Sequence, residues 1–330
     1  MNPHLLLDLA GTLATAPDGG TVSVAARSRT DAELASRWCD RSGNRFVAWH
    51  GDHVEIRRGR SPDPLADLPD HLRPGRRVWL YTNFDCNLAC SYCCVSSSPR
   101  APRRALGLET IRSVVAQAPA VGARELYLTG GEPFLLPDIS AVVEACTAAL
   151  PTIVLTNGLL FRGARLRVLE SLPREQLALQ ISLDSAAPAL HDAQRGLGTH
   201  SRALAGIHTA VELGFRVRVA ATLGPGHRDE ERELHRRCDD LGIPAADRVI
   251  RRIARQGEAD GGVVVTRAGL IPEVCLTADG VYWHPVAATD PAMRVTDRVL
   301  PLADAVDLVT AEFADHRRRG EELVSSFPCA

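Results

Sequence analysis

Residues 84–93 read Phe84-Asp85-Cys86-Asn87-Leu88-Ala89-Cys90-Ser91-Tyr92-Cys93. The cysteines Cys86, Cys90 and Cys93 are separated by three and then two residues, a spacing that fits one tight loop. Three such thiolates can each bind a different iron of a [4Fe–4S] cluster, whereas electron-transfer clusters of this type use four. One iron would then have an open position, which is where metal chemistry takes place. Zinc loops and redox motifs also use short cysteine spacings.

A glycine-rich turn, Thr129-Gly130-Gly131-Glu132-Pro133-Phe134, follows about 40 residues later, after the apolar run 125–128. In isolation such a turn is an ordinary loop. The two motifs, in this order and after strand-like segments, resemble the radical S-adenosylmethionine (SAM) superfamily. In that family, reduction of the cluster cleaves SAM to a 5′-deoxyadenosyl radical, which abstracts a hydrogen atom from the substrate.

The resemblance implies two cofactors, one [4Fe–4S] cluster held by the three motif cysteines and SAM bound to the open iron. The turn is expected to meet the amino group of SAM through Gly130, Gly131, Glu132 and Pro133, because glycine permits close approach of the backbone. Four further residues are implied as SAM contacts: Asn157, Ser182, Asp184 and Arg195. Cys94, which directly follows the motif, is a less favoured rival ligand.

The sequence around the four further residues also indicates what they do, independently of the resemblance. Ser182 and Asp184 alternate along one strand and therefore share a face, and an otherwise apolar strand would not carry them without polar partners. Arg195 could pair bidentately with the carboxylate of SAM. Asn157 begins an Asn-Gly pair, which equally predicts a plain turn.

Composition restricts the class of protein. The chain has 330 residues, enough for one large α/β domain and a small appended one, and its formal net charge of −2 gives no reason to expect nucleic acid. The leucines at residues 5–7 are interrupted by Asp8 and lack a basic flank, so they do not form a signal peptide. No apolar stretch approaches the roughly 20 residues needed to span a membrane. Nine cysteines without a secretion signal indicate a reducing compartment, and we expect a soluble cytoplasmic protein.

The pattern divides the chain before the cysteine loop. Residues 1–60 read as a small α+β domain, with strands at 21–25, 45–49 and 53–56 and a helix from Asp31 to about Asp40. Residues 61–76 form a linker rich in proline and aspartate. The small domain offers no cofactor ligand set, so we expect it to recognise a substrate or partner.

Residues 77–257 alternate strands and helices six times, which predicts an α/β fold, a partial (β/α)6 TIM-type barrel. The expected strands are 78–82, 125–129, 152–156, 177–183, 215–220 and 247–253. The expected helices are 108–117, 139–150, 162–171, 201–213 and 228–241. Reactive groups in such barrels lie at the carboxyl ends of the strands, where both motifs fall.

Residues 258–330 are expected to form a short C-terminal extension. The sequence predicts strands at 263–265 and 272–277, a hairpin turn at Asp279-Gly280 and a helix over 301–319.

The stretch 273–285 resembles the start of the SPASM or twitch domains, which bind auxiliary clusters. Pro285 stands where those domains have a second cysteine, and only Cys275 and Cys329 lie beyond residue 257. A remnant without metal is therefore expected. Either thiol could instead donate a hydrogen atom to a substrate radical.

Two substrate classes remain open. A peptide, as in the maturation of ribosomally made natural products, is favoured by the resemblance of His191-Asp192-x-x-Arg195-Gly196 to the peptide-modifying branch. The small domain could then dock a leader peptide by strand addition. A small metabolite, such as an amino sugar or nucleoside, is favoured by the modest length. Either reaction needs an external one-electron reductant such as a flavodoxin or ferredoxin.

The alternative of another class is a non-catalytic zinc or iron–sulfur module. Structural zinc takes four ligands in a closed site, and His71, the nearest histidine, precedes the cysteine loop across a predicted strand. Zinc would also leave the glycine-rich turn unexplained.

Overall fold

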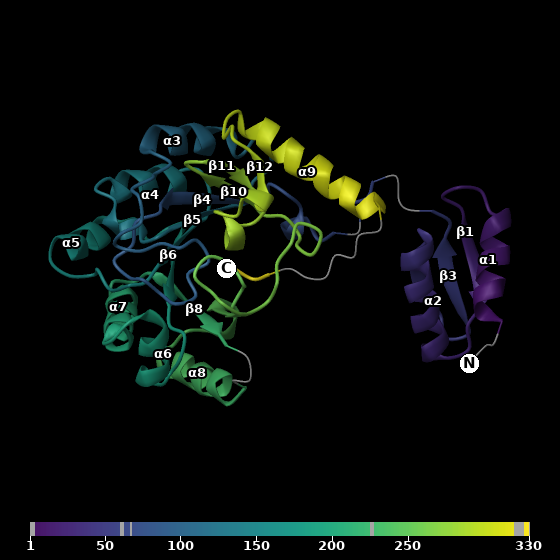
Figure 1. Ribbon diagram of the computed structural model, residues 1–330, viewed down its shortest axis with the longest axis horizontal. Helices are drawn as coiled ribbons and strands as arrows, with labels where there is room; N and C mark the ends of the chain where they lie inside the picture. Colours follow the sequence, from purple (N-terminus) through teal and green to yellow (C-terminus); the bar gives the residue numbers. More distant parts are fainter. Residues whose placement is uncertain (1–3, 60–62, 67, 225–227, 320–326, 330) are drawn as a thin grey trace. The chain divides into compact units, whose positions relative to one another are not determined.

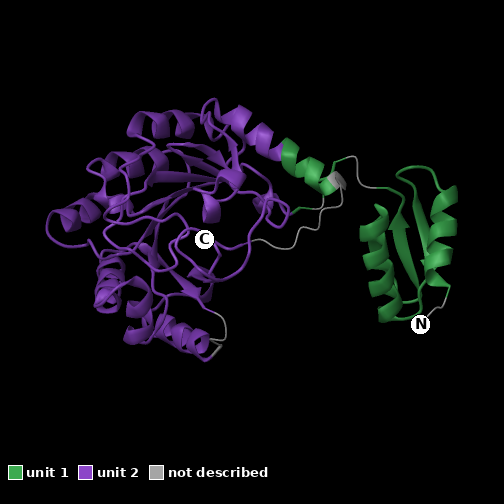
Figure 2. Cartoon of the chain, viewed as in Figure 1, with its two compact units in different colours: residues 1–68, 311–323 green, residues 69–310, 324–330 purple. Residues whose placement is uncertain are grey.

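The computed structural model describes residues 4–59, 63–66, 68–224, 228–319 and 327–329 (Figure 1). Contacts divide the chain into two compact units (Figure 2). Unit 1 comprises residues 1–68 and 311–323, and unit 2 comprises residues 69–310 and 324–330. The predicted linker 61–76 lies partly outside the described residues, and its last part belongs to unit 2.

Unit 1 is a three-stranded antiparallel sheet with strand order β1-β3-β2, packed against two helices. Its elements are α1 (Leu5–Thr15), β1 (Thr21–Ala25), α2 (Arg29–Ser42), β2 (Arg45–Trp49) and β3 (His53–Arg57). The three predicted strands and the helix α2 are present. Ser28, rather than a residue inside the helix, caps α2 by accepting a hydrogen bond from Asp31 N at 3.1 Å.

Helix α1 was not expected from the sequence. Its buried residues are Leu5, Leu9 and Leu13, which recur every fourth position and so form one apolar stripe. They join a core that α1 and α2 share with the sheet, including Val54 and Ile56 of β3. Unit 1 therefore has a hydrophobic core of its own.

Unit 2 is built on a nine-stranded sheet with the order β12-β11-β10-β4-β5-β6-β7-β8-β9. Six neighbouring strands run parallel and correspond to the six predicted βα units. They are β4 (Arg77–Asn83), β5 (Glu125–Gly130), β6 (Thr152–Thr156), β7 (Leu177–Ser182), β8 (Arg216–Leu223) and β9 (Arg248–Arg252). The predicted α/β partial barrel is confirmed, and the sheet does not close on itself, since β12 and β9 end the strand order.

Helices connect these strands and surround the sheet (Figure 1). They are α3 (Leu108–Gln117), α4 (Ile139–Thr147), α5 (Ala164–Ser171), α6 (Pro188–Arg195), α7 (Thr199–Glu212) and α8 (Arg228–Asp240). Five were expected, with ends that differ by a few residues. The eight-residue α6 was missed, because two turns are too short to establish a clear helical period.

The C-terminal region continues the sheet of unit 2 instead of forming a unit of its own. Its elements are β10 (Val274–Thr277), β11 (Gly280–Tyr282), β12 (Arg294–Thr296) and α9 (Leu302–Arg319). Strand β10 pairs parallel with β4, and the predicted hairpin joins β10 to β11. The boundary predicted at residue 257 is therefore not a boundary between compact units. The predicted strand 263–265 is absent, and only an isolated bridge joins Val263 to Ala254.

Among the described residues, no helix combines the length and the hydropathy that crossing a membrane requires.

Candidate functional site

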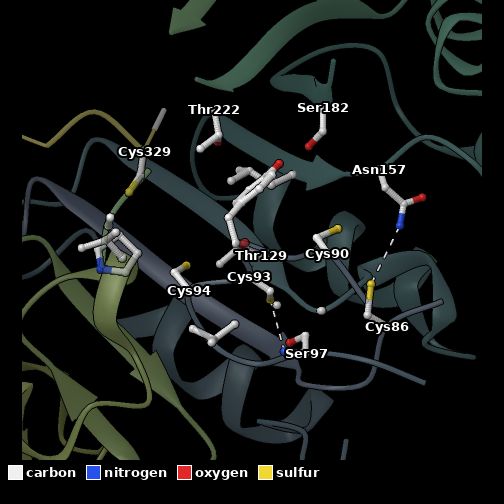
Figure 3. A pocket seen from close by; sticks show the side chains of 18 of the residues that line it. Cys86, Cys90, Cys93, Cys94, Ser97, Thr129, Asn157, Ser182, Thr222 and Cys329 are labelled. Carbon is white, nitrogen blue, oxygen red and sulfur yellow. Dashed lines mark hydrogen bonds between the residues drawn. The ribbon is translucent and has the colours of Figure 1, made fainter. Parts of the chain in front are cut away.

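The carboxyl ends of all six parallel strands contribute to one cavity with about 1000 Å³ of empty space. This is the end of a parallel barrel at which active sites form. The predicted site residues that line the cavity are Cys86, Cys90, Cys93, Gly130, Gly131, Asn157, Ser182 and Arg195. Three others, Glu132, Pro133 and Asp184, do not line it. Figure 3 shows the labelled cysteines of the loop near Asn157, Thr129 and Ser97.

The cysteine loop follows β4 and is held from several sides. Within the loop, Cys93 Sγ accepts a hydrogen bond from Ser97 N at 3.2 Å, and Cys86 Sγ accepts one from Leu88 N at 3.4 Å. Three backbone hydrogen bonds come from other elements: Glu132 N to Asp85 O (3.1 Å), Ser91 N to Gln194 O (2.9 Å) and Glu258 N to Cys93 O (3.0 Å). These bonds hold in place the loop that carries the three thiols.

The glycine-rich turn packs directly against this loop. A Cβ atom on Gly131 would lie 2.2 Å from Asp85 O, closer than real Cβ contacts allow. A Cβ atom on Gly130 would lie 2.3 Å from Asn83 O, and Gly130 has a φ of 149°, which favours glycine. Both glycines are thus required for the packing of β5 against the cysteine loop, whatever else they contact.

Glu132 is fully buried, and its carboxylate is occupied by the protein. Its Oε1 accepts hydrogen bonds from Phe134 N (3.0 Å) and Thr156 Oγ1 (2.8 Å), and its Oε2 accepts one from Asn157 N (2.8 Å). Burial raises the pKa of Glu132, and these hydrogen bonds only partly oppose the shift. The carboxylate thus joins the turn after β5 to the end of β6. Pro133 begins the short 3-10 helix η2 (Pro133–Leu135) that follows.

Asn157 lies between the end of β6 and the cysteine loop. Its Nδ2 donates to Asn87 Oδ1 at 2.8 Å and lies 4.0 Å from Cys86 Sγ, and its Oδ1 accepts from Leu159 N at 3.0 Å (Figure 3). Ser182 ends β7 on another side of the cavity. Both residues line the same cavity as the three thiols.

Asp184 and Arg195 bind each other. Arg195 Nε donates to Asp184 Oδ2 at 2.6 Å, and the second contact, Nη2 to Oδ1, is 3.3 Å. Asp184 also accepts from Tyr92 OH (2.6 Å) and Thr222 N (3.0 Å). Burial would raise the pKa of Asp184, but the charge and hydrogen bonds of Arg195 outweigh it and lower the pKa. Arg195 reaches Asp184 because α6 brings it back to the end of β7. Its pairing with a ligand carboxylate stays a prediction.

Replacing Asp184 by alanine is expected to lower the free energy of unfolding by about 3–5 kcal/mol, since the buried Arg195 charge would lose its partner. Urea unfolding at neutral pH measures this. The control is Glu109→Ala, because the exposed Glu109–Arg112 pair contributes little. The pKa of Asp184 is lower in the folded than in the unfolded chain, so its contribution is present above about pH 4 and is lost as the pH falls through the lowered pKa. A difference from wild type that stayed unchanged well below pH 4 would contradict this assignment.

The donor set of the cysteine loop fits a metal cluster. Burial, followed by the charge of Glu132, raises the pKa of Cys86 to about 12. Burial also raises the pKa of Cys90, against the effect of Arg195. Such thiols keep their protons unless a metal replaces them. Among the described residues, no three His, Cys, Asp or Glu side chains converge as ligands of a single ion would, whereas the thiolates of a [4Fe–4S] loop each bind a separate iron.

The remaining cysteines differ in their access to the cavity. Cys94 and Cys329 line it, whereas the buried Cys275 in β10 does not. The carbonyl of Cys329 accepts hydrogen bonds from Gln180 Nε2 and from Arg251 Nη1, both at 2.9 Å. Burial raises the pKa of the Cys329 thiol. The C-terminal residues 327–329 are thus part of the cavity wall.

Several cavity residues were not anticipated from the sequence. Arg251 and Arg252 end β9, and their position at a strand end was the available signal. Tyr92 lies in the cysteine stretch, but no role was expected for it, and its bond to Asp184 depends on where the end of β7 lies. Gly257 packs on the cysteine loop: its φ is 58°, and a Cβ atom there would lie 2.2 Å from Cys93 O.

Comparison with known families decides the assignment of this site. The sequence profile described as the Radical SAM superfamily matches residues 80–238, the region that contains both motifs and the end of β7. Residues 80–238 of the chain form a radical SAM domain. The radical SAM fold implies a [4Fe–4S] cluster and SAM as its cofactors.

Curated relatives of this radical SAM chain have different functions. It is 31% identical over 165 residues to the antilisterial bacteriocin subtilosin biosynthesis protein AlbA of Bacillus subtilis, a match that covers 48% of this chain and 36% of AlbA. It is 33% identical over 158 residues to a GTP 3′,8-cyclase of Aeromonas hydrophila, covering 44% of this chain and 45% of the cyclase. The matches therefore span less than half the length of either relative.

Solved radical SAM structures share the fold at lower identity. SuiB of Streptococcus suis bound to S-adenosylmethionine superimposes with a TM-score of 0.50 at 20% identity, over 59% of this chain and 45% of SuiB. The protein anSMEcpe with bound AdoMet and the Cp18Cys peptide has a TM-score of 0.53 at 13% identity, over 72% of this chain and 81% of that one. At these identities the likeness concerns the fold alone.

Proposed function

We propose that Cys86, Cys90 and Cys93 hold a [4Fe–4S] cluster and that SAM binds beside it in the cavity. The cluster held by these three cysteines would supply one electron to SAM, which is the chemistry that yields methionine and a 5′-deoxyadenosyl radical able to take a hydrogen atom from the substrate. The observation that carries this proposal is that three thiols from one braced loop face a cavity formed by six strand ends. The electron comes from an external one-electron reductant, such as a flavodoxin or ferredoxin, in a reducing, cytoplasmic setting.

The predicted SAM residues take two different roles in this proposal. Gly130, Gly131, Asn157 and Ser182 line the cavity and would contact SAM directly. Glu132, Pro133 and Asp184 would act through the backbone and side chains that they hold in place, because their polar groups are bonded to the protein. Arg195 lines the cavity, but its guanidinium is already paired. It would shape the wall beside Cys90 rather than clamp a ligand.

A peptide is the substrate class that we propose. AlbA, whose name assigns it to the biosynthesis of a bacteriocin, supports a role in peptide maturation. The second candidate is a nucleotide or another small metabolite, which the likeness to GTP 3′,8-cyclase favours.

Reduced enzyme with SAM should release more 5′-deoxyadenosine with its true substrate than alone. A precursor peptide encoded beside the gene and GTP are the two substrates to compare. Stimulation by GTP and not by the peptide would reverse the assignment.

Unit 1 is proposed to recognise the peptide. Its sheet exposes Val47 and Trp49 on β2, an edge strand, so an extended peptide could add alongside. Its core, formed by residues of α1, α2 and the sheet, supports independent folding.

A chain beginning at Pro74 tests this role. We expect it to keep the cluster and the slow cleavage of SAM without substrate, and to lose turnover of the true substrate. Iron content and 5′-deoxyadenosine release, measured together with product formation, distinguish loss of the cofactors from loss of substrate recognition. Full turnover by the soluble truncated chain would eliminate the recognition role. If the first residues serve only to cover an exposed face, the truncated chain is expected to be insoluble. Substitution of Val47 and Trp49 by serine in the full chain then repeats the test.

Cys329 is the better placed of the two thiols considered as hydrogen donors. It lines the cavity, and its raised pKa keeps the S–H bond intact at neutral pH. Cys275 is buried in β10 away from the cavity. A donor role is therefore proposed for Cys329 only, for a reaction that returns a hydrogen atom to the substrate.

A further inference from the structure

The charges on the cavity wall have one sign. Among the described residues that line the cavity, the charged side chains are Arg195, Arg251 and Arg252, and none is Asp, Glu or His. Arg195 is neutralised by Asp184 in a buried pair. Within the described residues, the other two arginines of the wall have no carboxylate beside them.

Arg251 is half-buried, and its side-chain partners among the described residues are neutral. Its Nε donates to Thr222 Oγ1 at 3.1 Å and its Nη1 donates to Cys329 O at 2.9 Å. These bonds fix the plane of the guanidinium, and they use two of its five N–H donors. Arg252, the next residue, has no hydrogen bond or ion pair within the part of the chain that the structure describes.

Other arginines near the same strands are paired. Arg216 at the start of β8 bonds Asp247 at 2.6 Å, and Arg248 at the start of β9 bonds Asp239 at 2.5 Å. The two arginines without a carboxylate thus occur at the end of β9 that faces the cavity. A fixed guanidinium with free donors in a partly desolvated cavity is suited to bind an anionic oxygen group.

We propose that Arg251 and Arg252 form a subsite for an anionic group of the substrate, a carboxylate or a phosphate. The proposal rests on the proposed function, because it takes the cavity to be the reaction site. Arg251 would orient the group through its fixed fork, and Arg252 would add charge at the mouth. A carboxylate would come from an acidic residue or the C-terminus of a peptide, and a phosphate from a nucleotide.

The test is a calorimetric titration of the anaerobic holoenzyme, saturated with SAM, at constant ionic strength. Succinate probes carboxylate binding, inorganic pyrophosphate probes phosphate binding, and dimethyl succinate is the uncharged control. We expect one of the two anions to bind, and its dissociation constant to rise about tenfold or more in Arg251→Gln, as for the loss of a charge-assisted hydrogen bond. The anion that binds identifies the source. Arg112→Gln, the same change on the outer helix α3, should leave the binding unchanged.

Three results would overturn the subsite. They are the absence of binding by both anions, binding that Arg251→Gln and Arg252→Gln leave unchanged, and anion binding that appears only when SAM is left out of the titration, which would assign the arginines to the SAM carboxylate. Iron content checks that each variant folds. If Arg251→Gln loses iron, the effect of Arg252→Gln on anion binding decides whether the subsite exists, because the Arg252 side chain is exposed. Binding does not require turnover, so anion binding by an enzyme that forms no 5′-deoxyadenosine would reject the proposed function and keep the subsite.

Discussion

Replacing Cys86, Cys90 and Cys93 together by alanine is expected to lower the iron content from about four atoms per chain to almost none. Each thiol would bind a different iron, so the triple variant keeps none of the motif's three ligands. Iron and sulfide are assayed on protein reconstituted anaerobically, together with the absorption spectrum.

The control for this experiment is the double variant Cys146→Ala, Cys238→Ala. Both side chains are buried in helices away from the cavity, so the iron content should remain near that of wild type. About four irons retained by the triple variant would contradict the assignment of the loop. Seven to eight irons in wild type, with about four left in the triple variant, would show an auxiliary cluster and refute the expectation of a C-terminal remnant without metal.

Substituting Gly131 by valine is expected to reduce both iron content and SAM cleavage by about tenfold or more. The added Cβ would lie 2.2 Å from Asp85 O and 2.9 Å from Phe84 O, both backbone atoms next to Cys86. Backbone cannot rotate away as a flexible side chain does, so the cysteine loop must shift. From the sequence alone, this valine would be expected to contact SAM, so that SAM binding weakens and the iron content does not change. The structure indicates that the loop itself is displaced.

The matched control is Gly261→Val, because a Cβ atom on Gly261 meets nothing within 4 Å and its backbone does not need glycine. Its iron content should match that of wild type. Normal iron with weakened SAM binding in Gly131→Val would restore the simpler interpretation, in which the glycine serves only the approach of SAM.

The sequence was most informative where structure is local and periodic. Strand β6 and helix α3 have the predicted bounds, and six βα units were recognisable because each strand and helix carries its own hydrophobic pattern. In the C-terminal region the strand, the hairpin and the long helix were predicted, but the pairing of β10 with β4 was not, because it joins residues almost 200 positions apart. No local pattern encodes which strand edge a later segment will join.

The site shows the same limit. The cysteines and the glycine-rich turn were found because each motif is contiguous. The bond between Asp184 and Arg195 was missed, although both residues were selected, because it depends on the direction in which α6 returns over β7. Arg251 and Arg252 were not selected, because their position at the end of a predicted strand was the one available signal and no motif accompanies it.

The most direct test of the account is the release of 5′-deoxyadenosine by the full chain, reconstituted anaerobically and incubated with SAM and dithionite. We expect slow release by wild type without substrate, at a rate that falls to background in the Cys86→Ala, Cys90→Ala, Cys93→Ala variant. Chromatography with mass spectrometry measures the product. Wild-type protein that carries about four irons and binds SAM, yet forms no 5′-deoxyadenosine above the triple variant, would contradict the assignment of this cavity as a radical SAM active site.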